Sequence, residues 1–200
     1  MKKYFCALLI IFSLTSCGWV LRKLYGVGQP RLQTPESIQQ YLAKKGLPLN
    51  TLTLDSSTYS PYEHNGQVTI SPPFPLNFAV YNPKGYRIYI NDHCDYVLLD
   101  SIRHNTYTID TSNSLSTLKN KLNDINGNPF QEQFTTDGKN YLYVIYWTMW
   151  SGRISTDLIK TVKHYTDSTA NCKLILINCD FLKRWAWTKK YSIKIDFNYN

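Results

Sequence analysis

The residues whose types and spacing most resemble an active site lie in the segment from Tyr146 to Gly152, which has the sequence YWTMWSG. Two tryptophans three residues apart end an apolar run, and a helix is predicted to begin after the glycine, so Ser151 stands close to a helix start. A serine hydroxyl is a useful nucleophile only beside a base and a third, orienting group. His164 would lie about two and a half turns along the helix, ~15 Å away. We therefore do not expect a serine hydrolase.

The cysteines form a second candidate set, because Cys94, Cys172 and Cys179 all lie beyond the N-terminal segment. Cys172 and Cys179 are seven residues apart on one extended stretch, a separation of about 23 Å, whereas a disulfide needs Cα atoms within about 7 Å. These two cannot bridge each other. Cys94 could pair with either of them in an oxidising compartment, or all could be buried free thiols. One thiol stays unpaired in any case, so a redox role for Cys94 stays open.

Two further groups have less specific patterns. Residues 92 to 95 (DHCD) are metal-ligand types, but contiguous residues seldom converge on one ion, and no complementary pair with metal spacing appears elsewhere. The aspartates suit a helix start better, so we expect no metal and no cofactor. Trp185 and Trp187 either form a binding face or cover a sheet, and aromatics at this spacing are more often packing than recognition.

The structural unit that the sequence predicts most clearly is a βαβ unit. Tyr141 to Trp147 is apolar throughout, which predicts a central strand buried on both sides. It is followed by an amphipathic helix from Ser155 to Thr166 and a buried strand from Lys173 to Asn178, which should be parallel to the first strand. The other predicted elements are a capped helix from Thr34 to Gly46, strands at 51–54, 68–70 and 191–197, a β-hairpin from Phe78 to Ile90, and helices at 95–104 and 114–122.

The segment from Tyr141 to Asp180 resembles the core of the thioredoxin superfamily, with a buried strand ending in aromatic-x-x-Trp, an active-site turn, a long helix and a strand closing with Asn-x-Asp. The family's Trp-Cys-Gly-Pro-Cys aligns with Trp150-Ser151-Gly152-Arg153-Ile154. Trp150 and Gly152 match, but Ser151 and Ile154 replace both cysteines and Arg153 replaces the proline. Disulfide exchange needs a thiolate and a resolving thiol. The resemblance therefore implies a scaffold without redox activity at this turn.

A second part of the family pattern precedes the first. Pro75, the predicted hairpin and the predicted helix at 95–104 are similar to the family's proline, hairpin and final helix, but their order relative to the βαβ unit is reversed. One account is a circularly permuted thioredoxin-like domain, and the other is a generic hairpin followed by a helix. The resemblance also implies a groove around Trp147, Trp150 and Pro75, where relatives hold extended peptides.

The N-terminus predicts the location. Lys2 and Lys3 precede a nine-residue apolar stretch, too short to cross a bilayer, which is typical of a signal peptide. The following LTSC resembles the lipobox of bacterial lipoproteins, so cleavage after residue 16 would leave Cys17 lipidated. Gly18 after the cysteine favours the outer membrane. Cleavage would lower the formal net charge from +8 to +6, and the scattered basic residues do not indicate a nucleic-acid partner.

These observations predict a signal peptide at 1–16, a lipid-anchored tether at 17–33 without a fold of its own, and one α/β domain at 34–200. The domain is expected to be a thioredoxin-like three-layer sandwich with a central mixed sheet and flanking helices. The whole chain resembles thioredoxin-like lipoproteins of Bacteroidetes-type bacteria. We expect a noncatalytic binding or scaffolding module with a protein partner in the cell envelope. The alternatives are a redox protein with displaced cysteines, and a surface binder of glycans or other macromolecules that uses the C-terminal tryptophans.

Overall fold

The chain folds into an α/β structure, as its sequence predicts. The computed structural model describes residues 23–59, 62–64, 67–70, 77–89, 107–131, 139–186, 188 and 192–195. The elements are α2 (Pro35–Lys45), β1 (Thr51–Leu54), the 3₁₀ helix η1 (Ser56–Thr58), β2 (Tyr62–His64), β3 (Gln67–Ile70), β4 (Asn77–Tyr81), β5 (Tyr86–Tyr89), β6 (Thr108–Ser114), α4 (Leu115–Lys119), β7 (Leu122–Asn123), β8 (Tyr141–Trp147), α5 (Arg153–Ser168), β9 (Cys172–Asn178) and β10 (Ser192–Ile195).

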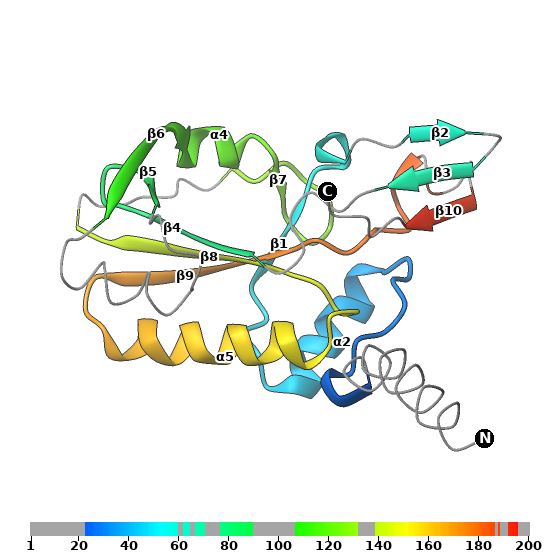
Figure 1. Ribbon diagram of the computed structural model, residues 1–200, viewed down its shortest axis with the longest axis horizontal. Coiled ribbons are helices and arrows are strands. Elements are labelled where there is room, and N and C mark those ends of the chain that lie inside the picture. Colours follow the sequence, from blue (N-terminus) through cyan, green and yellow to red (C-terminus); the bar gives the residue numbers. More distant parts are fainter. Residues whose placement is uncertain are drawn as a thin grey trace, which may run out of the picture.

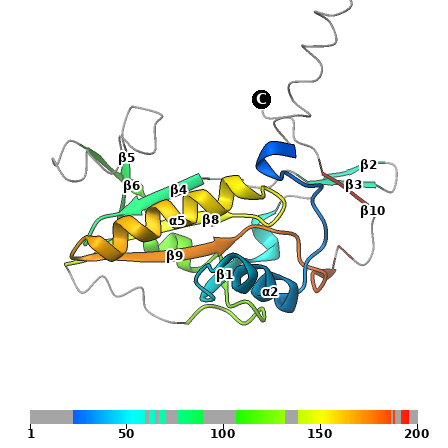
Figure 2. The same cartoon turned by 90° about the horizontal axis from the view of Figure 1, so that it is seen from below.

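A seven-stranded mixed sheet with the order β6-β5-β4-β8-β9-β1-β7 forms the centre of the fold (Figure 1). The three strands β8, β9 and β1 are parallel, and antiparallel strands extend the sheet on both sides. Helices α2 and α5 cover one face, which is turned toward the viewer in Figure 2, whereas the short helix α4 lies on the other (Figure 1). The predicted mixed sheet with flanking helices is therefore confirmed.

The predicted βαβ unit is present with nearly the predicted bounds. Strand β8 is buried from Leu142 to Trp147, and its residues pair in parallel with β9, from Tyr141 opposite Cys172 to Trp147 opposite Asn178. Helix α5 connects the two strands and turns Ile159 and Val162 toward the sheet, where both are buried. A strand without polar side chains on either face is stable only under cover on both sides.

Helix α2 has the signals that its sequence predicts. Thr34 and Ser37 form a reciprocal capping box, in which each backbone N–H donates to the other residue's hydroxyl, at 2.9 and 3.3 Å. Gly46 ends the helix in the left-handed conformation, with φ of 63°. Ile38 and Leu42 are completely buried and hold the helix against the core.

The predicted hairpin is formed by β4 and β5. Its turn is fixed by Asn82, whose side-chain oxygen accepts hydrogen bonds from the backbone N–H groups of Lys84 and Tyr86, both at 3.0 Å. Gly85 has a φ of 83°, which favours glycine. Strand β4 also pairs antiparallel with β8, from Asn77 opposite Tyr146 onward. The hairpin thus lies beside the central strand, although it comes much earlier in the chain.

The helix predicted from 114 to 122 is shorter in the structure, and the strands beside it were missed. Helix α4 ends at Lys119, and Leu122 belongs to β7, where it pairs with Leu54 of β1 and is buried. Leu122 fits the helical spacing of the other leucines, but it enters the core from the neighbouring strand. Strand β6 was not predicted because its sequence, TIDTSNS, is polar and mostly exposed at the edge of the sheet.

The strands predicted at 68–70 and 191–197 are present as β3 and β10, and together with β2 they form a second, smaller sheet. In this sheet β10 pairs in parallel with β3, and β2 pairs antiparallel with β3. The predicted helix at 95–104, the signal segment with Cys17, and Pro75, Cys94 and Trp187 lie outside the described residues.

Replacing Ile145 by alanine tests how strongly the fold depends on its central strand. Ile145 is completely buried, so the substitution should lower the free energy of unfolding by about 2 to 5 kcal/mol. Ile109→Ala, the same change in the edge strand β6 where the side chain is 49% exposed, should cost less than about 1 kcal/mol. Urea unfolding followed by circular dichroism measures both, and equal losses would contradict the assignment of β8 as the core strand.

Candidate functional site

The turn between β8 and α5 contains a closed cluster of hydroxyl groups. The hydroxyl of Ser151 donates to the carbonyl of Thr148 at 2.8 Å and accepts from the Thr148 hydroxyl at 2.9 Å. It is also hydrogen-bonded to the hydroxyl of Ser155, which in turn accepts the backbone N–H of Thr148 at 3.3 Å. All three side chains are completely buried. The proton and both lone pairs of Ser151 are therefore used inside the turn.

This cluster is unsuited to nucleophilic catalysis. Ser151 has no exposed surface, and its hydrogen-bond partners are Thr148 and Ser155, neither of which is a base. His164 is exposed further along α5. A buried serine with no base beside it remains a structural hydroxyl. The two neighbours that also align with the redox motif, Arg153 and Ile154, are exposed at the first turn of α5 and carry no thiol.

Trp147 does not line a groove, which corrects the expectation for this residue. Its side chain is completely buried, its ring stacks on Tyr41 of α2 with centroids 6.0 Å apart, and its indole N–H donates to the hydroxyl of Thr51 at 3.2 Å. Trp150 is only half-buried, and Pro75, the third residue of the predicted groove, lies outside the described residues. Trp147 therefore joins α2 to the sheet.

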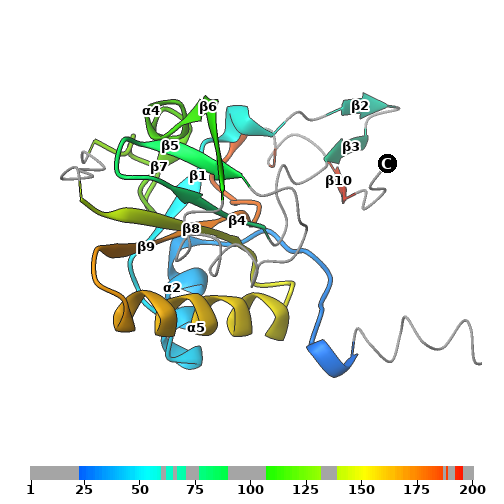
Figure 3. The ribbon, with the colours of Figure 1, turned by 60° about the vertical axis from the view of Figure 1, so that its left-hand side comes forward.

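The N-terminal segment, which was expected to be a tether without a fold of its own, lies against the same turn. The backbone N–H of Gly28 donates to the carbonyl of Trp150 at 2.7 Å. Gly152 has a φ of 60°, and a Cβ atom there would lie 2.3 Å from the carbonyl oxygen of Gly26. Gln33 continues the contact by pairing with Leu182. The chain thus covers part of the turn with its own backbone (Figure 3).

A buried carboxyl group lies directly behind the turn. One oxygen of Asp180 accepts the backbone N–H of Met149 and the side-chain amide of Asn178, both at 2.8 Å, while its other oxygen has no hydrogen-bond partner. Burial raises the pKa of this carboxyl to about 7, against the smaller opposing effect of the two hydrogen bonds. Asp180 therefore holds the loop after β8, and near neutral pH it is only partly ionised.

The two described cysteines are free and unsuited to thiol exchange. Cys179 follows β9 and is completely buried, and desolvation raises its pKa well above that of an ordinary thiol. Cys172 is half-buried at the start of the same strand, and burial raises its pKa as well. Reactive cysteines have a lowered pKa. Cys94, the third candidate, lies outside the described residues.

Of the two C-terminal tryptophans, Trp185 is part of the core. It is 6% exposed, and its ring lies 4.7 Å from that of Tyr59 and 6.5 Å from that of Phe181, measured between centroids. The packing interpretation therefore holds for Trp185.

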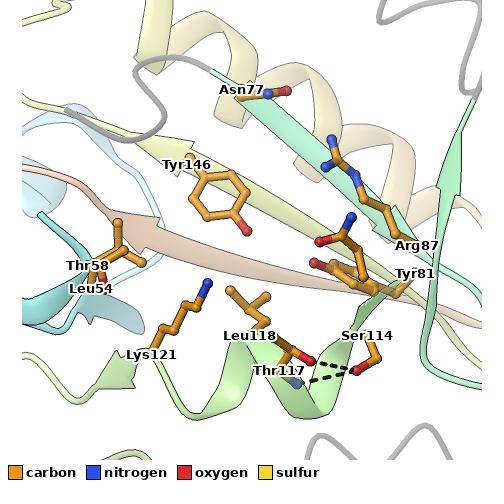
Figure 4. A pocket seen from close by; sticks show the side chains of 11 residues that line it. Leu54, Thr58, Asn77, Tyr81, Arg87, Ser114, Thr117, Leu118, Lys121 and Tyr146 are labelled. Carbon is orange, nitrogen blue, oxygen red and sulfur yellow. Dashed lines mark hydrogen bonds between the residues drawn. The ribbon is translucent and has the colours of Figure 1, made fainter. Parts of the chain in front are cut away.

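A cavity of about 70 Å³ lies on the other face of the sheet, between α4 and the strands β4, β5 and β8 (Figure 4). No sequence motif indicates this cavity, because its lining comes from segments that lie far apart in the chain. Its charged residues are Arg87 of β5 and Lys121, which follows α4, and the Tyr81 and Tyr146 side chains line it from the sheet. Tyr146 directly precedes Trp147 in β8, so the two side chains point to opposite faces.

Comparisons of the chain with protein-family models, curated proteins and solved structures found no match. Within the described ranges, no group of three or more histidine, cysteine, aspartate or glutamate side chains is placed to hold a metal ion. Helices long and apolar enough for a membrane span are likewise missing from the residues that the structure describes.

Alanine at Gly152 tests the contact between the N-terminal segment and the turn. Gly26→Ala is the matched control, since Gly26 also has a positive φ but open space around its Cα. Because both glycines have a positive φ, backbone strain should cost each variant about 1 to 3 kcal/mol. Gly152→Ala must also displace Gly26, so trypsin should cleave after the exposed Arg31 markedly faster than in the control. Equal cleavage rates in the two variants would show that the segment is not held at the turn.

Asp180→Asn tests the buried carboxyl. Because the folded chain binds this proton more tightly than the unfolded chain, the contribution of Asp180 to stability is greatest below about pH 4 and is lost as the pH rises to about 7. The asparagine variant keeps an acceptor oxygen without the charge. Its stability relative to the wild type should therefore rise between pH 5.5 and 7.5, by at most about 4 kcal/mol over the whole titration.

Urea unfolding at several pH values measures this difference. The exposed Asp157 on α5 provides the control variant Asp157→Asn, whose stability should follow that of the wild type throughout this range. Parallel curves for Asp180→Asn and the wild type would mean that Asp180 ionises in the folded chain as it does in water.

Proposed function

We propose that the protein is a noncatalytic binding module with a redox-silent, thioredoxin-like architecture, held in the bacterial cell envelope by a lipid on Cys17. The observation that carries this proposal is the hydroxyl cluster at the turn, where Ser151 is completely buried and fully hydrogen-bonded. The turn that would carry redox chemistry in the family instead stabilises the start of α5.

The strand arrangement supports the architectural part of the proposal. A permuted domain requires the hairpin to lie in the same sheet as the βαβ unit, antiparallel to its first strand, while preceding it in the chain. Strands β4 and β5 satisfy this requirement, since β4 pairs antiparallel with β8 and lies on the side opposite β9. A generic hairpin and helix could have packed elsewhere.

The position of the N-terminal segment suggests how the module is presented. Gly26 is held at the turn and lies nine positions after Cys17, so the chain between them can span at most about 30 Å. With a lipid on Cys17, the first turn of α5 would remain within this distance of the membrane surface. The exposed residues there, Arg153 and Ile154, are the part of the turn that a partner could contact.

The two alternative functions, a redox protein with displaced cysteines and a glycan binder, have less support from the described residues. A redox protein with displaced cysteines would have to rely on Cys94, because burial raises the pKa of Cys172 and of Cys179. A glycan-binding face would have to rely on Trp187, because Trp185 is packed against Tyr59 and Phe181.

An insulin-reduction assay tests the redox-silent part of the proposal. The full-length chain should reduce insulin no faster than dithiothreitol alone, because a serine hydroxyl cannot form the mixed disulfide. A Cys-x-x-Cys oxidoreductase in the same assay is the positive control. Reduction that is abolished by alkylating the chain beforehand would overturn the proposal and would favour a cysteine elsewhere.

Site-specific crosslinking in intact cells tests the binding part. A photoreactive amino acid at Ile154, which is 38% exposed at the start of α5, should give a discrete adduct with an envelope protein. The same probe at His164, exposed at the far end of the helix, is the matched control and should give none. Failure to crosslink at Ile154, or equal adducts at both positions, would contradict a partner surface at the turn.

A further inference from the structure

The cavity between α4 and the sheet has the properties of a ligand site. Among the described residues its lining contains two cationic side chains, Arg87 and Lys121, and no carboxylate. The Nε atom of Arg87 is buried and has no hydrogen-bond partner. We propose that this cavity binds one oxyanion group, a phosphate or a carboxylate, of a small ligand.

The two cations approach the cavity from different elements. Arg87 belongs to β5, whereas Lys121 lies in the short link between α4 and β7, so an anion bound by both side chains would contact two separate segments. The carboxylate of Asp110, the residue opposite Arg87 in the pairing of β5 with β6, is already bonded to the hydroxyl of Ser112 and the amide of Asn113 at 2.5 and 2.6 Å. It is not part of the lining, so the positive charge in the cavity is not neutralised from within.

Tyrosine hydroxyls supply neutral donors on the sheet side. Tyr81 and Tyr146 both line the cavity, and a phenol hydroxyl can donate a hydrogen bond to an oxyanion. Burial raises the pKa of both phenols, so both remain protonated at neutral pH. In Figure 4 the Tyr146 hydroxyl and the Lys121 amine point toward each other across the cavity. An oxyanion there could accept from both, with charge-assisted hydrogen bonds.

The size of the cavity limits the ligand class. A single water needs roughly 10 to 15 Å³ of such space. The cavity of about 70 Å³ therefore has room for a phosphate or carboxylate group, but it is far smaller than the 300 Å³ or more that is usual for a drug-sized ligand. Thr58, whose hydroxyl oxygen is buried without a partner, adds a further polar group to the lining. The rest of a larger ligand would have to extend outside.

Calorimetric titration of the full-length chain tests this inference. Inorganic phosphate and acetate are the two probes, in separate arms, and sodium chloride at matched ionic strength is the control for screening. We expect saturable binding of at least one oxyanion and none of chloride, and the arm with the stronger binding identifies which oxyanion the cavity prefers. No saturable binding of either probe up to about 50 mM would overturn the proposal, since two cations should hold a complementary anion below this concentration.

Four variants locate the binding. Lys121→Gln removes an exposed charge with little risk to folding, and Tyr146→Phe removes only a hydroxyl; each should weaken oxyanion binding about tenfold or more, as should Arg87→Gln. Lys160→Gln removes the same charge as Lys121→Gln from the exposed side of α5, on the other face of the sheet, and should leave binding unchanged. Equal affinities in Lys121→Gln and Lys160→Gln would mean that the anion binds elsewhere. This result would leave the proposal for the turn untouched, because the two sites lie on opposite faces.

Discussion

The alternation of side chains along β8 is the constraint on which the rest of the structure depends. Because β8 is the central strand of the sheet and is covered on both faces, its side chains go alternately to two different environments. Tyr143 and Trp147 contact Tyr165 of α5 and Tyr41 of α2. Tyr146 points to the other face and lines the cavity beside α4. A shift of one residue in register would exchange these two sets.

The two faces consequently have different characters. On the helical face, the end of β8 leads into a turn whose polar groups are satisfied internally, by Thr148, Ser151 and Ser155 among themselves. On the opposite face, the buried Nε atom of Arg87 and the buried hydroxyl of Thr58 have no partner. One oxygen of Asp180 behind the turn is also unpaired, but Arg87 and Thr58 differ from it because they line a cavity with room for a ligand. An unsatisfied buried polar group is costly, and a bound ligand can satisfy it.

The fold was predictable where local signals and burial agree. Strand β8 and helix α2 lie where the apolar run and the cap residues Thr34 and Gly46 place them, because each signal is contained in a single segment. The spacing of Leu115, Leu118 and Leu122 was misleading, since the last of these residues is buried by pairing with β1. The cavity could not be predicted, because Arg87 and Lys121 meet only after several strands and α4 have packed. An aromatic residue at a strand end, such as Trp147, gives no sign of which face will cover it.

The attachment of the N-terminal segment to the turn has a mechanical consequence. A chain tethered through Cys17 would transmit any tension from the membrane first to Gly26 and Gly28, then to the two hydrogen bonds that join Gln33 to Phe181 and Lys183. These few contacts would break one after another, and each break would lengthen the N-terminal segment before the force reached the sheet. The N-terminal segment would thus extend under force before the sheet begins to unfold.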